Sequence, residues 1–164
     1  MPSTARQKLI GAAAGTALAL ATAAATGAEA RVPYPDGYRG WHHVKSMVIE
    51  PGHPLERPFA GIHHVYADDA ALEGLRTGRY RDGATLVFDL LEARRGDHAL
   101  VEGPRKLLGV MVRDPHARAT GGWRFEAFAG SSRTERLVTD GGAGCFACHR
   151  KAADRAYVFS RWRD

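Results

Sequence analysis

The residues best suited to chemistry lie near the end of the chain, where Cys145, Cys148 and His149 form the pattern C-x-x-C-H. Two cysteines three positions apart share one face of a helical turn, so both sulfur atoms can reach the two vinyl groups of one porphyrin. The histidine that follows can then present an imidazole nitrogen to the iron. This pattern is typical of c-type haem attachment, with Cys145 and Cys148 as thioether residues and His149 as the metal ligand.

Two other uses of a cysteine pair stay open, a redox-active dithiol and a structural disulfide. A redox pair normally begins a helix early in a βαβ unit, whereas this pair follows the glycine-rich residues 141–144 near the C-terminus. A four-cysteine zinc site is excluded because the chain contains only two cysteines. The spacing and the position in the chain therefore favour haem.

The group on the other side of the iron decides what a haem protein does. Met47 and Met111 could provide a sixth ligand for an electron carrier, although core packing is the more common use of a methionine on a strand. Among the histidines, His63 and His64 are neighbours on a predicted strand. Alternation sends them to opposite faces, so one of the two can point inward.

The elements that must position these residues are mostly strands. Five short segments rich in β-branched and aromatic residues are separated by turn signals, among them Gly103-Pro104. The segments cover residues 41–49, 61–67, 84–91, 106–113 and 123–128.

Two helices are predicted as well. Asp68 and Asp69 can cap a helix that runs to about Arg76 and ends at Gly78, and a second helical stretch is expected from the cysteine motif into residues 152–162. A four-helix bundle is excluded because residues 41–130 lack long runs of helical period. The predicted class is α+β, mainly an antiparallel β-sheet with a few helices and the haem motif near the C-terminus.

Residues 1–30 of the 164-residue chain are predicted to be an export signal. Arg6 and Lys8 precede an alanine-rich apolar stretch that ends in the cleavage pattern Ala28-Glu29-Ala30. A membrane anchor is the alternative, but the stretch is weakly apolar and short. Cleavage would leave residues 31–164 as a single haem-binding domain in the periplasm. The net charge of +5 is mild and the arginines are scattered, so nucleic-acid binding is not indicated.

An ordered set of motifs extends the haem signal over the whole domain: GYRGW, HVKSMVI, GIHHVYA, DGA, GGW, C-x-x-C-H and YVF. This set resembles the cytochrome P-460 family over residues 34–162. The resemblance implies a mainly antiparallel β fold, a homodimer and one covalently attached haem c.

The resemblance also distinguishes two branches of that family. In one branch, a lysine on the strand after the Asp82-Gly83 turn is bonded to the porphyrin, and the protein oxidises hydroxylamine. In the cytochrome c′-beta branch, phenylalanines cap the distal side, and the haem binds nitric oxide and related gases. Here Phe88 occupies the lysine position. The resemblance implies Phe59 as the second capping ring. Lys45, on another strand, stays open as an alternative cross-link residue.

The leading hypothesis is therefore an exported mono-haem cytochrome with a five-coordinate iron and an apolar distal pocket that binds nitric oxide or a similar small gas. Enzymatic oxidation of hydroxylamine or nitric oxide is an alternative. It needs a proton acceptor, for which Glu126 and Asp89 are conceivable, although both are expected to be exposed strand carboxylates. Simple electron transfer to a redox partner protein is the third hypothesis. Whether the protein is an enzyme stays open.

Overall fold

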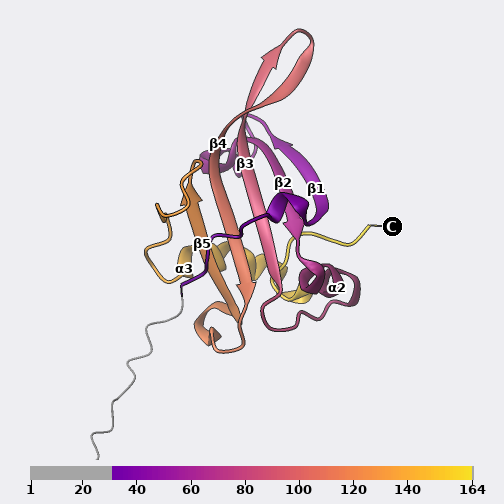
Figure 1. Ribbon diagram of the computed structural model, residues 1–164, viewed down its shortest axis with the longest axis vertical. Helices are drawn as coiled ribbons and strands as arrows, with labels where there is room; N and C mark the ends of the chain where they lie inside the picture. The colour runs from indigo at the N-terminus through magenta and orange to yellow at the C-terminus, as the bar shows by residue number, and fades with distance from the viewer. Residues whose placement is uncertain (1–30, 164) are drawn as a thin grey trace, which may run out of the picture. The chain divides into compact units, whose positions relative to one another are not determined.

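The computed structural model describes residues 31–163, and the predicted export signal lies outside these residues. Their centre is a five-stranded antiparallel sheet in which spatial order follows chain order (Figure 1). The strands are β1 (His42–Ile49), β2 (Gly61–Ala67), β3 (Thr85–Gly96), β4 (Ala99–Arg113) and β5 (Trp123–Ala129). The α-helices are α1 (Glu56–Phe59), α2 (Asp69–Thr77) and α3 (Ala143–His149). This arrangement confirms the predicted α+β class.

Helix α2 begins and ends as its sequence predicts. The Asp68 carboxylate accepts a hydrogen bond from the Ala71 backbone N–H at 2.7 Å, which satisfies one of the free donors of the first turn. The same carboxylate accepts from the Thr85 N–H at 3.1 Å, and so ties the helix to β3. Gly78 ends the helix at a φ of 75°, where a residue without Cβ is favoured.

Strands β3 and β4 are longer than predicted and form a hairpin that projects beyond the rest of the sheet (Figure 1). The predicted turn at Gly103-Pro104 is wrong, because these residues lie inside β4 and the chain reverses at Asp97-His98. The pairing of β3 with β4 shifts register close to Pro104. Such an irregularity tolerates a residue that has no N–H to donate.

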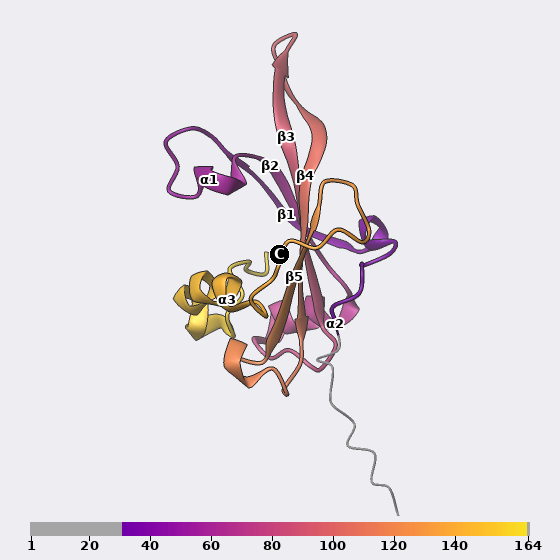
Figure 2. The same ribbon diagram turned by 90° about the vertical axis from the view of Figure 1, so that its left-hand side faces the viewer.

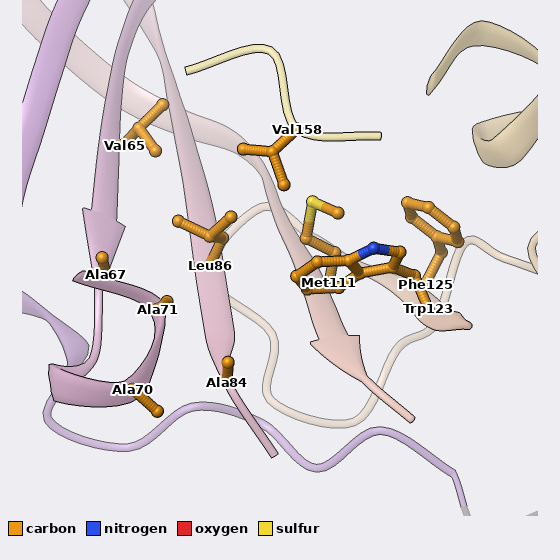
Figure 3. Close-up of a cluster of buried hydrophobic side chains, with 10 residues drawn as sticks. All are labelled: Val65, Ala67, Ala70, Ala71, Ala84, Leu86, Met111, Trp123, Phe125 and Val158. Carbon is orange, nitrogen blue, oxygen red and sulfur yellow. The ribbon is translucent and has the colours of Figure 1, made fainter. Parts of the chain in front are cut away.

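The sheet carries a separate apolar cluster on each face, and Figure 2 shows what covers them. We call the face that carries α3 the helix face, and the face covered by residues 31–41 the N-terminal face. The helix-face cluster contains Val65, Ala67, Ala70, Ala71, Ala84, Leu86, Met111, Trp123, Phe125 and Val158 (Figure 3). The N-terminal-face cluster contains Val32, Tyr38, Val87, Leu108, Val110 and Phe128. Alternation along each strand supplies both clusters.

The helix predicted from the cysteine motif to residue 162 is shorter than expected. Helix α3 ends at His149 and continues only as a 3-10 helix over Arg150–Arg155. Ala156 and Tyr157 then adopt left-handed backbone angles, with φ values of 50° and 67°. This turn reverses the chain so that Val158 is buried in the helix-face cluster.

None of the helices within residues 31–163 combines the length and the apolar character needed to cross a bilayer.

Candidate haem-binding site

The start of α3 is fixed against the sheet by hydrogen bonds and by a close backbone approach. The Asp140 carboxylate accepts from the backbone N–H groups of Gly144 at 2.8 Å and Gly142 at 2.9 Å, and these bonds lower its pKa. Gly142 has a φ of 88°, and a Cβ at this position would lie 3.1 Å from the Cβ of Phe125. Glycine therefore allows the cysteine helix to begin directly beside β5.

Both cysteines lie on α3, and both thiols are free and partly buried. Cys145 packs against the helix-face cluster. Burial raises the pKa of its thiol, and the negative charge of Asp140 adds to the effect. A redox-active dithiol needs the opposite, a lowered thiol pKa. The surroundings of Cys145 thus do not favour a redox pair, whereas two sulfurs three positions apart on one helix suit thioether attachment.

His149 ends the same helix and is held by a backbone carbonyl. Its Nδ1 lies 2.7 Å from the Tyr157 oxygen. Because a carbonyl can only accept, Nδ1 carries the hydrogen and Nε2 keeps its lone pair for a metal. The imidazole lies between the rings of Phe125 and Phe159, each with its centroid 5.0 Å away. Burial lowers the pKa of His149, which favours the neutral form that binds metals.

The loop that supplies this carbonyl is itself anchored, a feature that the sequence reasoning did not identify. The buried Trp123 donates its indole N–H to the Ala156 oxygen at 2.9 Å. The Tyr157 ring contacts Phe146 of α3, with 5.1 Å between centroids. Gly121 leaves room for both rings, since a Cβ there would lie 2.7 Å from each. The YVF motif is the local signal that could have indicated a role for this loop.

On the side of the sheet that faces α3, five directly paired residues form a row across the strands: Lys45, Val65, Phe88, Gly109 and Ala127. Directly paired residues of an antiparallel sheet point to the same face, which here is the helix face. Phe88 is the large apolar side chain in this row, and its neighbours on β4 and β5 are small. Its ring lies edge-on to that of Phe59, with 5.8 Å between centroids. The structure therefore brings together the two phenylalanines that the resemblance singled out.

His63 and His64 point to opposite faces, as alternation predicted. His63 lies on the helix face, where it is 2% exposed and its ring centroid lies 4.6 Å from that of Phe88. Burial, together with the positive charge of Lys45, lowers its pKa to about 4. The face whose β3 residues were predicted to be apolar thus also contains a buried imidazole from β2.

The other candidates on the helix face differ in burial. Met111 is buried in the core cluster, which is the common use of methionine. Met47 pairs with His63 and is half-buried. Lys45 is also half-buried, and burial lowers the pKa of its amine. It stands two strands away from Phe88, the position of the lysine in the other branch.

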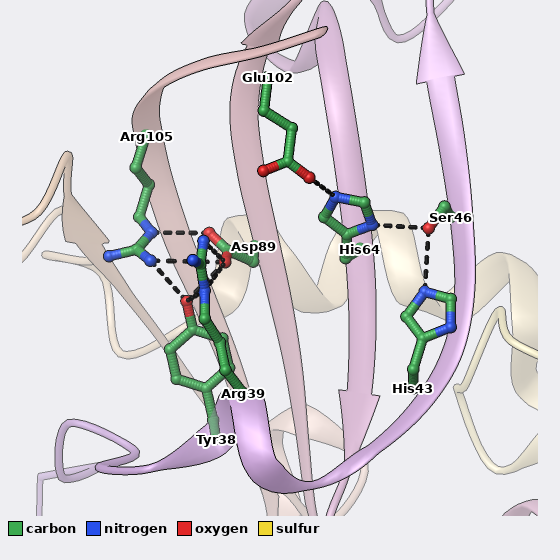
Figure 4. A network of polar contacts seen from close by, with 8 residues as sticks. All are labelled: Tyr38, Arg39, His43, Ser46, His64, Asp89, Glu102 and Arg105. Carbon is green, nitrogen blue, oxygen red and sulfur yellow. Dashed lines mark hydrogen bonds and ion pairs between the residues drawn. The ribbon is translucent and has the colours of Figure 1, made fainter.

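Asp89 corrects one sequence expectation, because it is fully buried rather than exposed. It lies on the N-terminal face and accepts hydrogen bonds from Tyr38 at 2.5 Å, Arg39 at 2.9 Å and Arg105 at 2.6 Å (Figure 4). Burial alone would raise the pKa of Asp89, but these donors outweigh it and hold the pKa below its ordinary value. The carboxylate is therefore ionised and fully occupied with structural partners.

Glu126 was expected to be exposed as well, and this expectation is also wrong. It is 8% exposed and forms an ion pair with Arg136 at 2.5 Å, on the same face as Asp89. Residues 31–41 cover this face, and Arg136 also donates to the Val32 carbonyl. The alternation of residues along a strand does not show that another segment covers the strand, so the burial of Glu126 was not predicted. Neither carboxylate can receive a proton from a ligand bound on the helix face.

These observations fit a porphyrin bound between the cysteine helix and the helix face of the sheet. Two free thiols and an imidazole with an available Nε2 lie on α3, and aromatic rings lie on the same face of the antiparallel sheet. Together these features are typical of a c-type haem protein. A comparison with family models agrees, since the model for Cytochrome P460 matches residues 35–160. The chain belongs to the cytochrome P460 family, and its cofactor is covalently attached haem c. No curated protein matches the chain closely enough to extend this assignment.

Proposed function

We propose that this cytochrome binds nitric oxide, or a similar small gas, at a five-coordinate haem iron. Cys145 and Cys148 would hold the haem through thioether bonds, and His149 would bind the iron through Nε2. The observation that carries the proposal is the contact between Phe88 and Phe59 on the helix face, the side of the sheet that also carries the cysteine helix. A phenyl ring at position 88 has no nitrogen that could bond to the porphyrin, so the chain resembles the cytochrome c′-beta branch.

Each side chain has a distinct task in this proposal. When bound, haem supplies an iron centre with one position left for a ligand. The Nδ1–H···O bond to Tyr157 fixes the orientation of the His149 ring and keeps its Nε2 unprotonated. The rings of Phe88 and Phe59 provide no donor strong enough to bind iron, and they exclude water from the ligand side. The phenyl rings themselves offer no hydrogen bond, and nitric oxide binds iron without one.

The two rival functions have less support from the structure. Hydroxylamine oxidation releases protons, and both carboxylates considered as acceptors lie on the opposite face in ion pairs. Electron transfer through a sixth methionine ligand would have to use Met47, because Met111 is packed into the core. Steady turnover of hydroxylamine with an electron acceptor would establish the first rival. An Fe–S charge-transfer band in the red would establish the second.

Titration of the ferrous protein with nitric oxide, followed by visible absorption, tests the proposal. We expect a high-spin, five-coordinate spectrum at rest and a saturable adduct. A resting spectrum that is already six-coordinate and low-spin would overturn the proposal. Peptide mapping by mass spectrometry should find haem on the peptide that contains Cys145 and Cys148, and no cross-link at Lys45.

Export and assembly are part of the same proposal. The amino-terminal signal pattern supports a mature protein that begins at Arg31 in the periplasm, which sequencing of the N-terminus of the native protein would test. The family resemblance supports a homodimer, and sedimentation equilibrium would measure its mass.

A further inference from the structure

Four polar residues are buried in the described chain: His63, Asp89, Thr120 and Glu126. Three of them have hydrogen-bond partners in the protein. Asp89 and Glu126 are in ion pairs, and the Thr120 hydroxyl donates to the Trp123 carbonyl at 2.5 Å. His63 differs, because its buried Nδ1 has no partner among the described residues. An unsatisfied buried nitrogen is unfavourable, so its partner is expected to be a bound group.

The position of the ring indicates which bound group this is. His63 lies on the helix face and contacts Phe88, which in turn contacts Phe59. The three rings form one aromatic wall, in which His63 alone carries hydrogen-bonding atoms. The wall lies on the helix face of the sheet, and Figure 2 shows that α3, the helix that ends at His149, lies on the same face.

We propose that the His63 side chain donates a hydrogen bond to the ligand bound at the haem iron. The proposal rests on the proposed function, since it requires that the ligand binds on the side of the aromatic wall. A neutral imidazole carries one N–H donor and one acceptor, so it can serve a ligand without placing a charge in the site. Burial and the nearby positive charge of Lys45 keep the ring neutral at physiological pH.

A hydrogen bond from His63 would allow the site to distinguish between ligands by their polarity. The phenyl rings exclude water, and a single N–H then stabilises an adduct whose outer atom carries negative charge. In such surroundings a hydrogen bond is stronger than in water, because no solvent competes for the donor. His63 would thus favour polar adducts over carbon monoxide, and Phe88 and Phe59 would set the space available.

The test is the C–O stretching frequency of the ferrous carbon monoxide adduct in the full-length holoprotein. The variant His63→Leu should raise this frequency, because removal of the N–H weakens back-donation from iron into the ligand. It should also speed dissociation of a polar adduct such as dioxygen about tenfold, the factor for one hydrogen bond. The matched control is His64→Leu, which changes the adjacent histidine on the opposite face and should leave both values unchanged.

Each outcome decides between specific alternatives. An unchanged frequency in His63→Leu overturns the proposal, since His63 then serves another group such as a haem propionate. If carbon monoxide still binds in that variant, the proposed function survives. A resting spectrum that converts from low-spin to high-spin in His63→Leu would identify His63 as an iron ligand and overturn both proposals. Should His63→Leu fail to fold, His63→Phe keeps an aromatic ring but has no N–H donor, so its frequency should also rise. An unchanged frequency in His63→Phe would likewise overturn the proposal.

Discussion

Two rows of residues, one position apart along the same strands, face opposite sides of this sheet. One row contains Lys45, Val65, Phe88, Gly109 and Ala127, and the other contains Ser46, His64, Asp89, Leu108 and Phe128. On the N-terminal face, polar groups have partners within the protein, as the network around Asp89 shows (Figure 4). On the helix face, the buried Nδ1 of His63 has none in the described chain. The polar groups around Asp89 therefore stabilise the fold, whereas His63 is the buried polar group that we propose binds the haem ligand.

The two adjacent histidines show the same contrast within a single strand. His64 lies between Ser46 and Glu102, with Nδ1 2.6 Å from the serine oxygen and Nε2 2.5 Å from the carboxylate. His63 is more deeply buried, and its nearest described aromatic neighbour is a phenyl ring. Because burial without a partner is unfavourable for an imidazole, the two residues should respond differently to substitution and to pH.

The largest effect is expected on the N-terminal face, from Asp89→Ala. This change leaves the guanidinium of Arg105, whose side chain is 13% exposed, without its buried partner. Breaking a buried ion pair in this way costs about 3–5 kcal/mol of unfolding free energy, which urea denaturation would measure. The haem spectrum should not change. The control is Glu92→Ala, which breaks an exposed pair with Arg94. A loss below about 1 kcal/mol for Asp89→Ala would contradict the structural role of this face.

The next effect concerns the pH dependence of stability on the helix face. His63 has a pKa of about 4 in the folded chain, against 6.5 for an unperturbed histidine. As pH falls below 6.5, the unfolded chain binds the proton first, so folding stability decreases until the pH reaches about 4. The difference corresponds to about 3 kcal/mol.

Denaturation of the ferric, ligand-free protein at pH 7 and at pH 4 would measure this loss. In His63→Leu the acid-side loss should be smaller by about 3 kcal/mol, because the residue that resists protonation is gone. His116→Gln, which removes an exposed imidazole, is the control for the loss of a histidine as such. Identical profiles for wild type and His63→Leu would mean that His63 is not buried as a neutral base.

A smaller effect is expected on the helix face, at the loop that holds His149, the proposed iron ligand. Trp123→Phe keeps an aromatic ring in the core but removes the N–H that bonds to the Ala156 carbonyl. The loss of this hydrogen bond should lower stability by about 1–2 kcal/mol. It should also shift the iron–histidine stretching band of the ferrous protein, because the adjacent Tyr157 carbonyl orients His149. Tyr80→Phe, in the ring that contacts Trp123, should leave that band in place.

Local patterns in the sequence were sufficient to predict the features with local causes. Alternation predicted the opposite orientation of His63 and His64, and capping chemistry predicted both ends of α2. The family resemblance singled out Phe59 and Phe88, which the structure places in contact. The first two features are determined by residues within a few positions of one another, and the third follows from the family motifs.

Contacts between distant segments could not be predicted in this way. The burial of Asp89 depends on Tyr38 and Arg105, which lie 51 and 16 positions away. The orientation of His149 depends on a left-handed turn at Ala156 that no turn signal marks. One local signal for Asp89 does exist, since a single acid inside the apolar run LVFDLL requires a buried partner if the strand is covered on both faces.

The smallest effect should come from the exposed part of the N-terminal face, at Glu102. Its side chain is 47% exposed, and that of its partner His64 is 17% exposed. A hydrogen bond between partly exposed side chains contributes about 1 kcal/mol or less, because water competes for both partners. A double-mutant cycle with Glu102→Gln and His64→Gln would measure the coupling. A coupling as large as the effect of Asp89→Ala would show that the whole row, and not only its buried centre, stabilises the fold.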